Sequence, residues 1–494
     1  MPQKVCLIGL DCAAPELVFD RWPELLPNIT QLRRCGVWGR LESTIPPITV
    51  PAWMCMMTGK DPGTLGIYGF RNRRDHSYDG LQFASSRLVK EPALWDIVAG
   101  SELKTIALGV PLTYPPRPIN GLMITDFLAP DTEADYTFPS DLKHEIRDVV
   151  GEYLFDTRQF RTENKDQLLA DIYEMTAQRF ALATHLIETK PWDLFVMVEM
   201  GPDRIHHGFW KYLDPLHPLH VPGNPFENAI RDYYVALDKH VGALIARLEP
   251  GVRVLVVSDH GAKRMDGGVC LNQWLIEQGY LTLKAPVTEI TRFSPDLVDW
   301  DNSRVWGDGG YYGRIFLNVK GREPRGTVDV DEIEPLIAEL QQKLEAQTDP
   351  TGKLLNNKIF RPENIYYRSR NVAPDLIAYF GDLHWRSVGS VGHPTCYTET
   401  NDTGPDDANH AQHGIFVMAD IGKFSPDAGE RDGLSLYDVA PTVLDALGVA
   451  IPEGVGRSGS IRLEGRSDGT VADDAYSPEE EEELARRLED LGYL

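Results

Sequence analysis

The sequence predicts an α/β fold in which a mainly parallel sheet is covered by helices on both faces. Short apolar runs rich in β-branched residues recur along the 494 residues, and longer segments with apolar residues every three or four positions separate them. Strands that alternate with helices form parallel sheets, because each helical crossover returns the chain to the same end of the sheet.

Apolar runs bounded by polar or turn residues have the character of buried strands. They occupy residues 5–11, 105–110, 192–199, 253–259, 313–319, 375–380 and 414–419. Helical periodicity is clear in residues 165–188, 227–248 and 328–344. Ligand-binding residues of such sheets gather where the strands end at the carboxyl edge, so the residues after these runs are the first site candidates.

One large domain over residues 1–465 is the simplest organisation, because no internal repeat or low-complexity linker divides it. Residues 284–358 interrupt the alternation and carry Tyr311, Tyr312 and Arg314 near a cluster of glycines. They predict an inserted cap, although surface packing explains such a segment equally well. Residues 466–494 form an acidic tail, in which we expect a loose segment over 467–475 and then a docked or solvated helix over 479–491.

The composition limits the partners. An excess of 74 acidic over 49 basic residues gives a formal net charge of −25, which repels a nucleic-acid duplex and anionic membrane surfaces. Hydrophobic residues at 42% and charged residues at 25% are typical of a globular protein and exclude disordered and fibrous classes. An anionic ligand would need locally concentrated positive charge, and metal ions supply it compactly.

The first apolar run is too short and too early for a signal peptide, and no stretch reaches the roughly 18 apolar residues of a membrane span. The scattered cysteines have no metal-ligand spacing, so we expect free thiols, most of them in the core. These are Cys6, Cys12, Cys35, Cys55, Cys270 and Cys396. We therefore expect a cytoplasmic protein.

Two strand ends carry groups able to bind a metal. Asp11 closes the run 5–11, and Asp259 with His260 closes the run 253–259 before Gly261. An aspartate at a strand end is most often a cap for the next helix, but Asp-His-Gly directly after a buried strand is less easily explained in that way. These residues therefore place two carboxylates and an imidazole at the same edge.

Further candidates follow the strand at 192–199 and precede the strand at 414–419. Asp203 and His207 are four residues apart, so on a helix both side chains point to one side and can hold one ion, whereas His206 points elsewhere. In the polar loop 401–413, His410 lies far enough before the strand to reach back over the sheet edge. His413 lies almost in the strand, so we expect His410 to be the ligand.

Thr49 lies at a predicted helix start, because the prolines around it force an extended approach and then open a helix that ends near Gly59. Free N–H groups and the helix dipole favour a phosphate oxygen or a developing alkoxide there. A threonine N-cap is the ordinary structural explanation. Gly59 and Lys60 do not form a phosphate loop, because Asp61 stands where serine or threonine is required.

Taken in chain order, these residues resemble the alkaline phosphatase superfamily. The similarity is greatest to its type I phosphodiesterase and nucleotide pyrophosphatase branch, and to related phosphohydrolases and phosphomutases. It extends from residue 5 to about residue 450 and includes the segment 437–444. The motifs occur in the order Asp11, Thr49, Asp203 with His207, Asp259 with His260, and His410.

The resemblance implies an alkaline-phosphatase-like fold and two divalent metal ions, usually zinc, with manganese as the alternative. The matching ligand sets are Asp203, His207 and His410, and Asp11, Asp259 and His260. Thr49 matches the nucleophile, which lies between the metals and contacts them. Two metals stabilise both the attacking and the leaving oxygen at phosphorus. The implied activity is hydrolysis of a small-molecule phosphate ester (a diester, a nucleotide pyrophosphate or a monoester) through a phosphothreonine.

One position departs from the family pattern. Ala52 stands where nucleotide pyrophosphatases carry an asparagine that holds a phosphate oxygen, so the preference for diester over monoester stays open. Another donor must take the place of that asparagine. The candidates are Asn72, Arg71, Lys263 and Asn272, and we expect Arg314 to help select the leaving group from the cap.

Two other functions remain open. A phosphomutase of the phosphoglycerate mutase type has a similar metal pattern with a serine nucleophile, and it transfers the phosphoryl group to a second hydroxyl. A catalytically silent metal-binding scaffold would keep the ligands for stability, but the complete ligand set with Thr49 argues against it. A sulfatase is excluded, because its cysteine or serine signature with a following proline and arginine is absent from the sequence.

Overall fold

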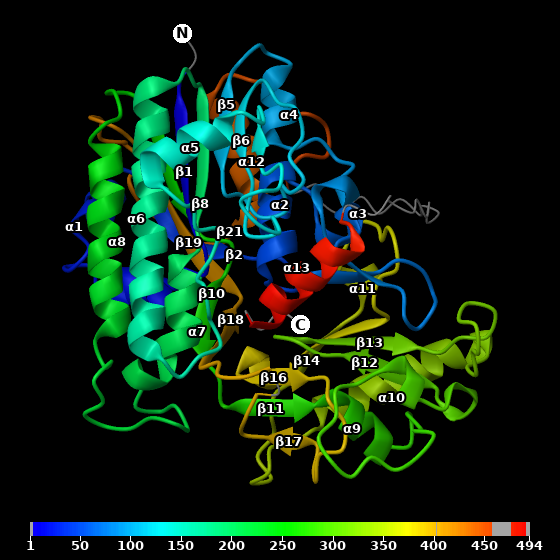
Figure 1. The fold of residues 1–494 in the computed structure, drawn as a ribbon. Coiled ribbons are helices and arrows are strands. Elements are labelled where there is room, and N and C mark those ends of the chain that lie inside the picture. Colours follow the sequence, from blue (N-terminus) through cyan, green and yellow to red (C-terminus); the bar gives the residue numbers. More distant parts are fainter. Residues whose placement is uncertain (1–2, 402, 457–475, 491–494) are drawn as a thin grey trace.

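The computed structural model describes residues 3–401, 403–456 and 476–490, and its centre is a ten-stranded sheet (Figure 1). The strand order is β20-β2-β19-β9-β1-β8-β5-β6-β7, with β21 paired to β2. The parallel centre comprises β1 (Val5–Leu10), β5 (Thr105–Leu108), β6 (Gly121–Ile124), β8 (Leu194–Glu199) and β9 (Arg253–Val257). Toward the edges lie β2 (Val37–Glu42), β7 (Thr137–Phe138), β19 (His413–Asp420), β20 (Gly429–Glu430) and β21 (Leu434–Ser435).

β1 lies in the middle of this sheet and pairs in parallel with β8 and β9. Every residue of β1, β5 and β8 is buried, which explains why these strands read as unbroken apolar runs. β19, in contrast, runs antiparallel to both β9 and β2. The predicted α/β fold with a mostly parallel sheet is confirmed.

Helices cover both faces of the main sheet (Figure 1). One face carries α1 (Pro27–Cys35), α6 (Lys165–Thr189), α7 (Gly201–Leu213) and α8 (Ala229–Ile245). The other carries α2 (Thr49–Thr58), α4 (Leu94–Ala99) and α12 (Val439–Ala446). Two short helices, α3 (Pro62–Leu65) and α5 (Leu142–Val150), complete this part of the chain. α6 and α8 are the helices that apolar periodicity predicts over 165–188 and 227–248.

Residues 267–398, here called the second lobe, build separate sheets below the main sheet in the view of Figure 1. One is antiparallel, with the order β12-β13-β15-β14, and the other has the order β16-β11-β17. The lobe has its own hydrophobic core, which includes Trp306, Phe316 and Phe380. Its strands are β11 (Gly267–Cys270), β12 (Val305–Asp308), β13 (Gly313–Leu317), β14 (Lys358–Phe360), β15 (Leu376–Tyr379), β16 (Trp385–Val388) and β17 (Tyr397–Thr398). Its helices are α9 (Leu271–Glu277), α10 (Ile333–Glu345) and α11 (Pro362–Ile365).

The second lobe corrects one expectation. Residues 313–319 and 375–380 are predicted as strands of the main parallel sheet, but they form β13 and β15, which are antiparallel neighbours in the lobe. An apolar run records burial on both faces and carries no information on strand direction or partner, so its sequence alone cannot separate the two sheets. Residues 284–358, where a cap is expected, lie inside this lobe, which extends beyond them at both ends.

Two short antiparallel pairs lie outside these sheets. β3 (Arg71–Arg73) pairs with β4 (Leu81–Phe83), and β10 (Gly261–Arg264) pairs with β18 (Ala408–Ala411). β10 starts directly after His260, and its Ala262 lies opposite His410 in β18. This pairing brings the loop that carries His410 back to the end of β9.

Helix α13 (Pro478–Asp490) packs against the rest of the described chain. Its Leu484 and Leu488 are fully buried, and Arg487 donates to the carbonyl oxygen of Phe127 at 2.8 Å. Ser477 and Glu480 form the predicted capping box, with N–H to side-chain distances of 3.3 and 2.7 Å. The expected loose segment 467–475 lies outside the described residues.

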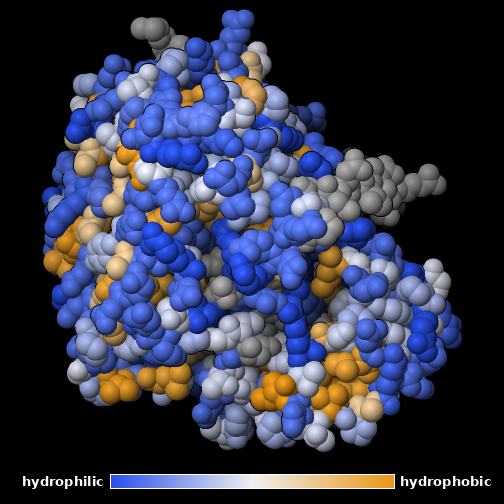
Figure 2. All heavy atoms as spheres, in the orientation of Figure 1, coloured by the Kyte–Doolittle hydropathy of each residue, from blue (hydrophilic) through white to orange (hydrophobic). Residues whose placement is uncertain are grey.

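The face of the molecule in Figure 2 is mostly hydrophilic, as expected for a globular chain with 25% charged residues. In the described part of the chain, no helix combines the length and the apolar character needed to cross a bilayer. All six cysteines are free thiols, and all except Cys35 are buried.

Candidate metal centre

Three neighbouring strands of the main sheet bring most of the candidate ligands to one edge. β8, β1 and β9 are adjacent and parallel, so their carboxyl ends meet. Asp11 follows β1, Asp259 and His260 follow β9, and α7 begins just after β8 and carries Asp203 and His207 one turn apart. All five side chains are buried, with at most 1% of each residue exposed. The structure therefore brings together the residues that strand ends and helical spacing single out.

His410 reaches the same cluster on β18. Its Nδ1 lies 2.8 Å from the carbonyl oxygen of Pro47 and must donate to it, so the Nε2 lone pair faces the cluster. That Nε2 lies 3.7 Å from Oδ1 of Asp203. His413 is exposed at the start of β19, and the buried His206 contacts the hydroxyl of Tyr234 at 3.2 Å.

Thr49 is the first residue of α2, at the predicted helix start. Its hydroxyl lies 3.2 Å from Nε2 of His260, and the residue is fully buried. One turn further on, Nε1 of Trp53 donates to Oδ2 of Asp11 at 2.6 Å, which ties α2 to the end of β1. The N-terminus of α2 therefore presents the Thr49 hydroxyl directly to the ligand cluster.

The donor atoms form three overlapping groups, in each of which all of them lie within 4.8 Å of one another. One group is Asp11, Asp259 and His260, which is one of the two ligand sets implied by the resemblance. The other groups are Asp203 with His260 and His410, and Asp203 with Cys12 and His207. Asp203, His207 and His410 are thus linked through Asp203, and Cys12 is a neighbour that no spacing pattern indicated.

Several buried atoms of the cluster lack hydrogen-bond partners among the described residues. They are Oδ1 of Asp11, Nε2 of His207, Oδ2 of Asp259 and Nε2 of His410. Buried polar atoms without partners are costly, and imidazole nitrogens with carboxylate oxygens are the donors that zinc and similar divalent ions bind. The cluster therefore fits divalent cations in both donor chemistry and unsatisfied bonding capacity.

The charges of the cluster favour a bound cation as well. Burial, reinforced by the charges of Asp259 and Asp203, raises the pKa of Asp11 well above its usual range, and burial also raises the pKa of Asp259. Burial acts in the same direction on Asp203, but the His207 and Arg204 charges outweigh it and hold the pKa of Asp203 well below its usual range. Positive charge between these carboxylates would allow all of them to ionise together.

Asp406 is a functional candidate that the sequence analysis missed. Its Oδ1 lies 2.7 Å from Nδ1 of His207, while its Oδ2 accepts from Arg161 and Arg386, each at 2.9 Å. Burial would lower the pKa of His207, but the charges of Asp406 and Asp203 raise it to about 9. The available signal was an acidic residue in the loop that carries His410.

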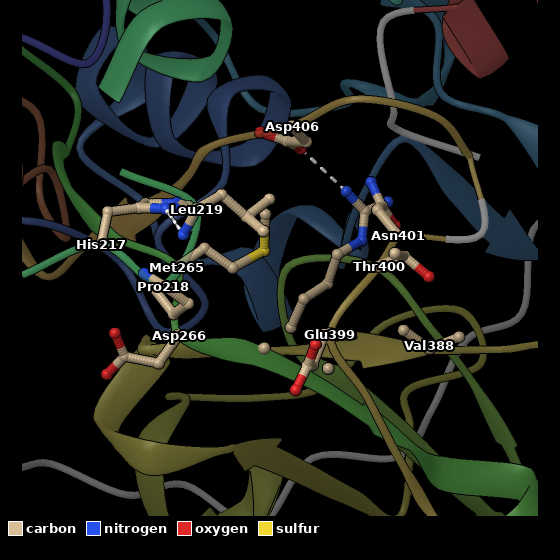
Figure 3. Close-up of a pocket in the computed structure, with 13 residues that line it drawn as sticks. His217, Pro218, Leu219, Met265, Asp266, Val388, Glu399, Thr400, Asn401 and Asp406 are labelled. Atoms are coloured by element: carbon tan, nitrogen blue, oxygen red, sulfur yellow. Dashed lines mark hydrogen bonds and ion pairs between the residues drawn. The ribbon is translucent and has the colours of Figure 1, made fainter. Parts of the chain in front are cut away.

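Figure 3 shows the carboxylate of Asp406 above a small pocket of about 30 Å³ lined by residues such as His217 and Met265. The dashed line from Asp406 marks its contact with the guanidinium of Arg386. A pocket of this volume has room for about one water molecule, so it is too small for a phosphate ester.

A larger cavity of about 500 Å³, here called the lobe cleft, lies where the β3–β4 hairpin, the second lobe and α13 meet. Trp306, Phe293 and Tyr78 give it aromatic walls, and Arg71 is among its cationic residues. A second small pocket, of about 20 Å³, is lined by Arg71 together with Ile48, the residue before Thr49. Arg71 thus contributes to both cavities.

The candidate substrate-binding residues occupy different places. Asn72 bonds within its own turn, and Asn272 lines the lobe cleft but bonds to the backbone of Gly307. Lys263 donates to the carbonyl oxygen of Asp382 at 2.8 Å and lines a different pocket. Arg314 lines the small pocket beside Ile48, where it pairs with Asp308 and donates to the carbonyl oxygen of Arg71.

Solved structures resemble this fold over most of its length. Human ectonucleotide pyrophosphatase/phosphodiesterase 5 matches with a TM-score of 0.53 at 16% identity, covering 92% of this chain and 97% of its own. Phosphonoacetate hydrolase from Sinorhizobium meliloti 1021, in complex with phosphonoformate, matches with a TM-score of 0.58 at 14% identity, covering 90% and 96%. At such identities these likenesses show the fold alone.

The sequence comparisons identify the family. None of the curated proteins compared with this chain matches it significantly. The family model described as type I phosphodiesterase / nucleotide pyrophosphatase matches residues 5–414, which contain every candidate ligand and Thr49. The chain therefore belongs to the type I phosphodiesterase/nucleotide pyrophosphatase family of the alkaline phosphatase superfamily, and it is a phosphoric ester hydrolase.

Proposed function

We propose that this protein hydrolyses a small-molecule phosphate ester with two divalent metal ions and a phosphothreonine at Thr49. The observation that carries the proposal is the position of the Thr49 hydroxyl, 3.2 Å from Nε2 of His260 at the N-terminus of α2. A threonine that only capped the helix would accept from its N–H groups, whereas no side-chain cap bond is made at this helix start.

Two sets of residues would hold the metals, zinc first and manganese as the alternative. The first is Asp11, Asp259 and His260, whose donor atoms form one group. The second is the set implied by the resemblance, Asp203, His207 and His410, in which Asp203 belongs to one group with His207 and to another with His410. Burial lowers the pKa of His260 to about 4, so its ring is neutral at pH 7 and keeps a lone pair for a ligand bond. Bound metals would supply positive charge to the attacking and leaving oxygens of the displacement.

The chain's own groups then perform the reaction. Oγ1 of Thr49 forms a bond to phosphorus while the bond from phosphorus to the leaving oxygen breaks, and the leaving group takes up a proton. Because Pro51 has no N–H, Thr49 and Val50 supply the unpaired donors of the first turn of α2, which favour a phosphoryl oxygen. Water then attacks the phosphothreonine, the bond from phosphorus to Oγ1 breaks, and Thr49 recovers its proton.

The test compares Thr49→Ala with Thr58→Ala, a buried threonine at the other end of the same helix. Thr49→Ala should abolish turnover and leave about two metals per chain in elemental analysis, because the six other proposed ligands remain. Thr49→Ser should keep partial activity, since it retains the hydroxyl. Acid-quenched wild-type enzyme should carry a phosphoryl group on the peptide that contains Thr49, and Thr58→Ala should retain that adduct.

The same assays separate the alternatives. Wild-type turnover by Thr49→Ala would refute the phosphothreonine and point to direct attack by water. Transfer of the phosphoryl group to an added alcohol, with little hydrolysis, would indicate a phosphomutase. If the protein binds metals but turns over no substrate, the result would support a catalytically silent metal-binding scaffold. The substrate classes are ranked by kcat/KM in assays with zinc or manganese. The substrates are aryl phosphate monoesters, diesters, phosphonates and sulfates.

A further inference from the structure

Arg71 lies at the junction between the region of Thr49 and the lobe cleft. It begins β3 and lines both the cleft of about 500 Å³ and the small pocket beside Ile48. Its carbonyl oxygen accepts from Arg314, which itself pairs with Asp308, so the backbone at Arg71 is anchored from the second lobe.

The guanidinium of Arg71 differs from those of its neighbours in having no partner. No described residue forms a hydrogen bond or ion pair with it, and its Nε is buried. In the same region, Arg386 pairs with Asp406, Arg314 with Asp308, and Arg292 with Glu489 of α13. Among these four described arginines, Arg71 is therefore the one whose guanidinium is left for a partner from outside the described chain.

The surroundings of Arg71 favour an anion. Burial lowers the pKa of Arg71, and the charge of Asp308 acts in the opposite direction without forming an ion pair with it. A partly desolvated cation binds an oxyanion more strongly than an exposed one, because charge-assisted hydrogen bonds gain strength away from water. The chain has a net charge of −25, so Arg71 does not belong to a generally basic surface. Its positive charge is local and would attract an anion specifically to this position.

The two cavities indicate which part of a substrate reaches Arg71. The pocket beside Ile48 has a volume of only about 20 Å³, whereas the lobe cleft has room for a sizeable group between Trp306, Phe293 and Tyr78. The two cavities share Arg71, Gly309 and Gly310, so a group attached to phosphorus at Thr49 and too large for the small pocket would extend past Arg71 into the cleft.

We infer that the lobe cleft receives the leaving group, and that Arg71 binds a second anionic group carried by it. The substrate class is a phosphate ester or phosphonate whose leaving group bears its own carboxylate or phosphate. This inference rests on the proposed function, since it takes Thr49 as the place where phosphorus reacts. Arg71, rather than the buried Arg314, is then the residue that recognises the leaving group.

The test uses two substrates of matched size, 4-carboxyphenyl phosphate and 4-carbamoylphenyl phosphate, with the metal-loaded full chain. Wild-type enzyme should prefer the carboxylate. Arg71→Gln should lower the ratio of the two kcat/KM values by roughly tenfold to a hundredfold, the value of one charge-assisted hydrogen bond. Arg71→Lys should recover part of the ratio, and Arg74→Gln, an exposed arginine on the same hairpin, should keep the wild-type ratio.

Two outcomes would overturn the inference, and a third substrate then ranks the oxyanions. An equal fall for both substrates in Arg71→Gln would overturn it, because Arg71 would then act on the reacting phosphoryl group. If Arg71→Gln does not fold, inhibition of the wild-type enzyme by 4-hydroxybenzoate and 4-hydroxybenzamide gives the answer, and equal inhibition by both contradicts the inference. An aryl phosphate mimic with a phosphonate in place of the carboxylate shows which oxyanion is preferred.

Failure of the proposed function has a different signature. In that case no phosphoryl adduct forms on Thr49 and no ester is cleaved by the metal-loaded wild-type chain. Calorimetric binding of 4-hydroxybenzoate to wild-type protein and to Arg71→Gln still tests the anion site. Loss of carboxylate binding in the variant supports the site, and unchanged binding refutes it.

Discussion

Asp406 contacts Nδ1 of His207, so Nε2 is the ring nitrogen that a proposed metal ion would bind in place of its proton. Burial alone would raise the pKa of Asp406, but the charges of Arg161, His207 and Arg386 hold it well below the usual range, so the carboxylate stays ionised. Nε2 of His207 is thereby directed to Oδ1 of Asp203, 3.3 Å away. Carboxylates behind a ligating histidine fix its ring and raise its basicity.

Asp406→Asn should therefore weaken metal binding by roughly tenfold to a hundredfold, because the ring loses its charged acceptor while every proposed ligand remains. Competition with a chromogenic chelator measures the affinity directly. Glu399→Gln is the control, since Glu399 is exposed at the edge of the neighbouring small pocket. Equal metal affinity in Asp406→Asn and wild type would show that His207 does not need this partner.

At the scale of single residues, the sequence predicted the candidate ligands that are recognisable from their spacing. Asp203 and His207, four apart on a helix, could be paired without a structure, and so could Asp259 with His260. Asp406 could not, because it approaches the cluster through the tertiary fold. Cys12 could not either, because it follows Asp11 directly but belongs to no metal-ligand spacing pattern. The side chain of Arg314 was expected at the leaving group, yet its position is fixed by Asp308 and by the carbonyl oxygen of Arg71.

Among the elements, the close approach of α2 to β1 determines the distance between Thr49 and Asp11. Gly9 in β1 permits it, because a Cβ at this position would collide with Cη2 of the Trp53 ring. Trp53 is fully buried and donates to Asp11, so it cannot move without losing that bond. The absence of a side chain at Gly9 therefore allows α2 to pack closely against the end of β1.

Gly9→Ala should destabilise the protein by about 1–3 kcal/mol, the usual effect of an extra methyl group in a packed core. It should also lower kcat, because α2 must move away from the strand end. Urea unfolding and steady-state kinetics measure the two effects. Gly100→Ala is the matched control, since Gly100 has helical φ and ψ angles at the end of α4. A Gly9→Ala variant as stable and active as Gly100→Ala would contradict this packing account.

The strands of the main sheet were predictable because each is a buried apolar run and because helical crossovers between such runs imply parallel pairing. The runs at 5–11, 192–199 and 253–259 became β1, β8 and β9. The runs at 313–319 and 375–380 were recognisable as strands but not as members of another sheet. Strand pairing depends on contacts between distant segments, which a local pattern does not contain.

The whole molecule joins the main sheet to a second lobe that has its own core, and the proposed metal centre lies entirely inside. The six proposed ligands are at most 1% exposed, so the ions would bind the folded chain and stabilise it. Burial raises the pKa of both Asp11 and Asp259 in this interior, so we expect the protein to be less stable without metal than with it.

Removal of metal by a chelator should therefore be slow and should lower the midpoint of thermal unfolding. At a free metal concentration a hundred times Kd, binding contributes about 2.7 kcal/mol to stability, and calorimetry with and without added zinc measures it. His410→Ala should reduce both metal content and the zinc-dependent shift. His413→Ala, exposed on β19, should behave as wild type, and the reverse result would assign the ligand role to His413.

Helix α13 has a practical consequence for how the protein is prepared. Its Arg487 is anchored on the main body, while its Glu489 lines the lobe cleft and pairs with Arg292. A charged affinity tag or fusion joined to this end of the chain follows Glu489 closely in sequence, so its charges would compete with Glu489 for Arg292. Purification handles and immobilisation chemistry belong at the amino-terminal end, before β1 begins at the opposite side of the sheet from the ligand cluster.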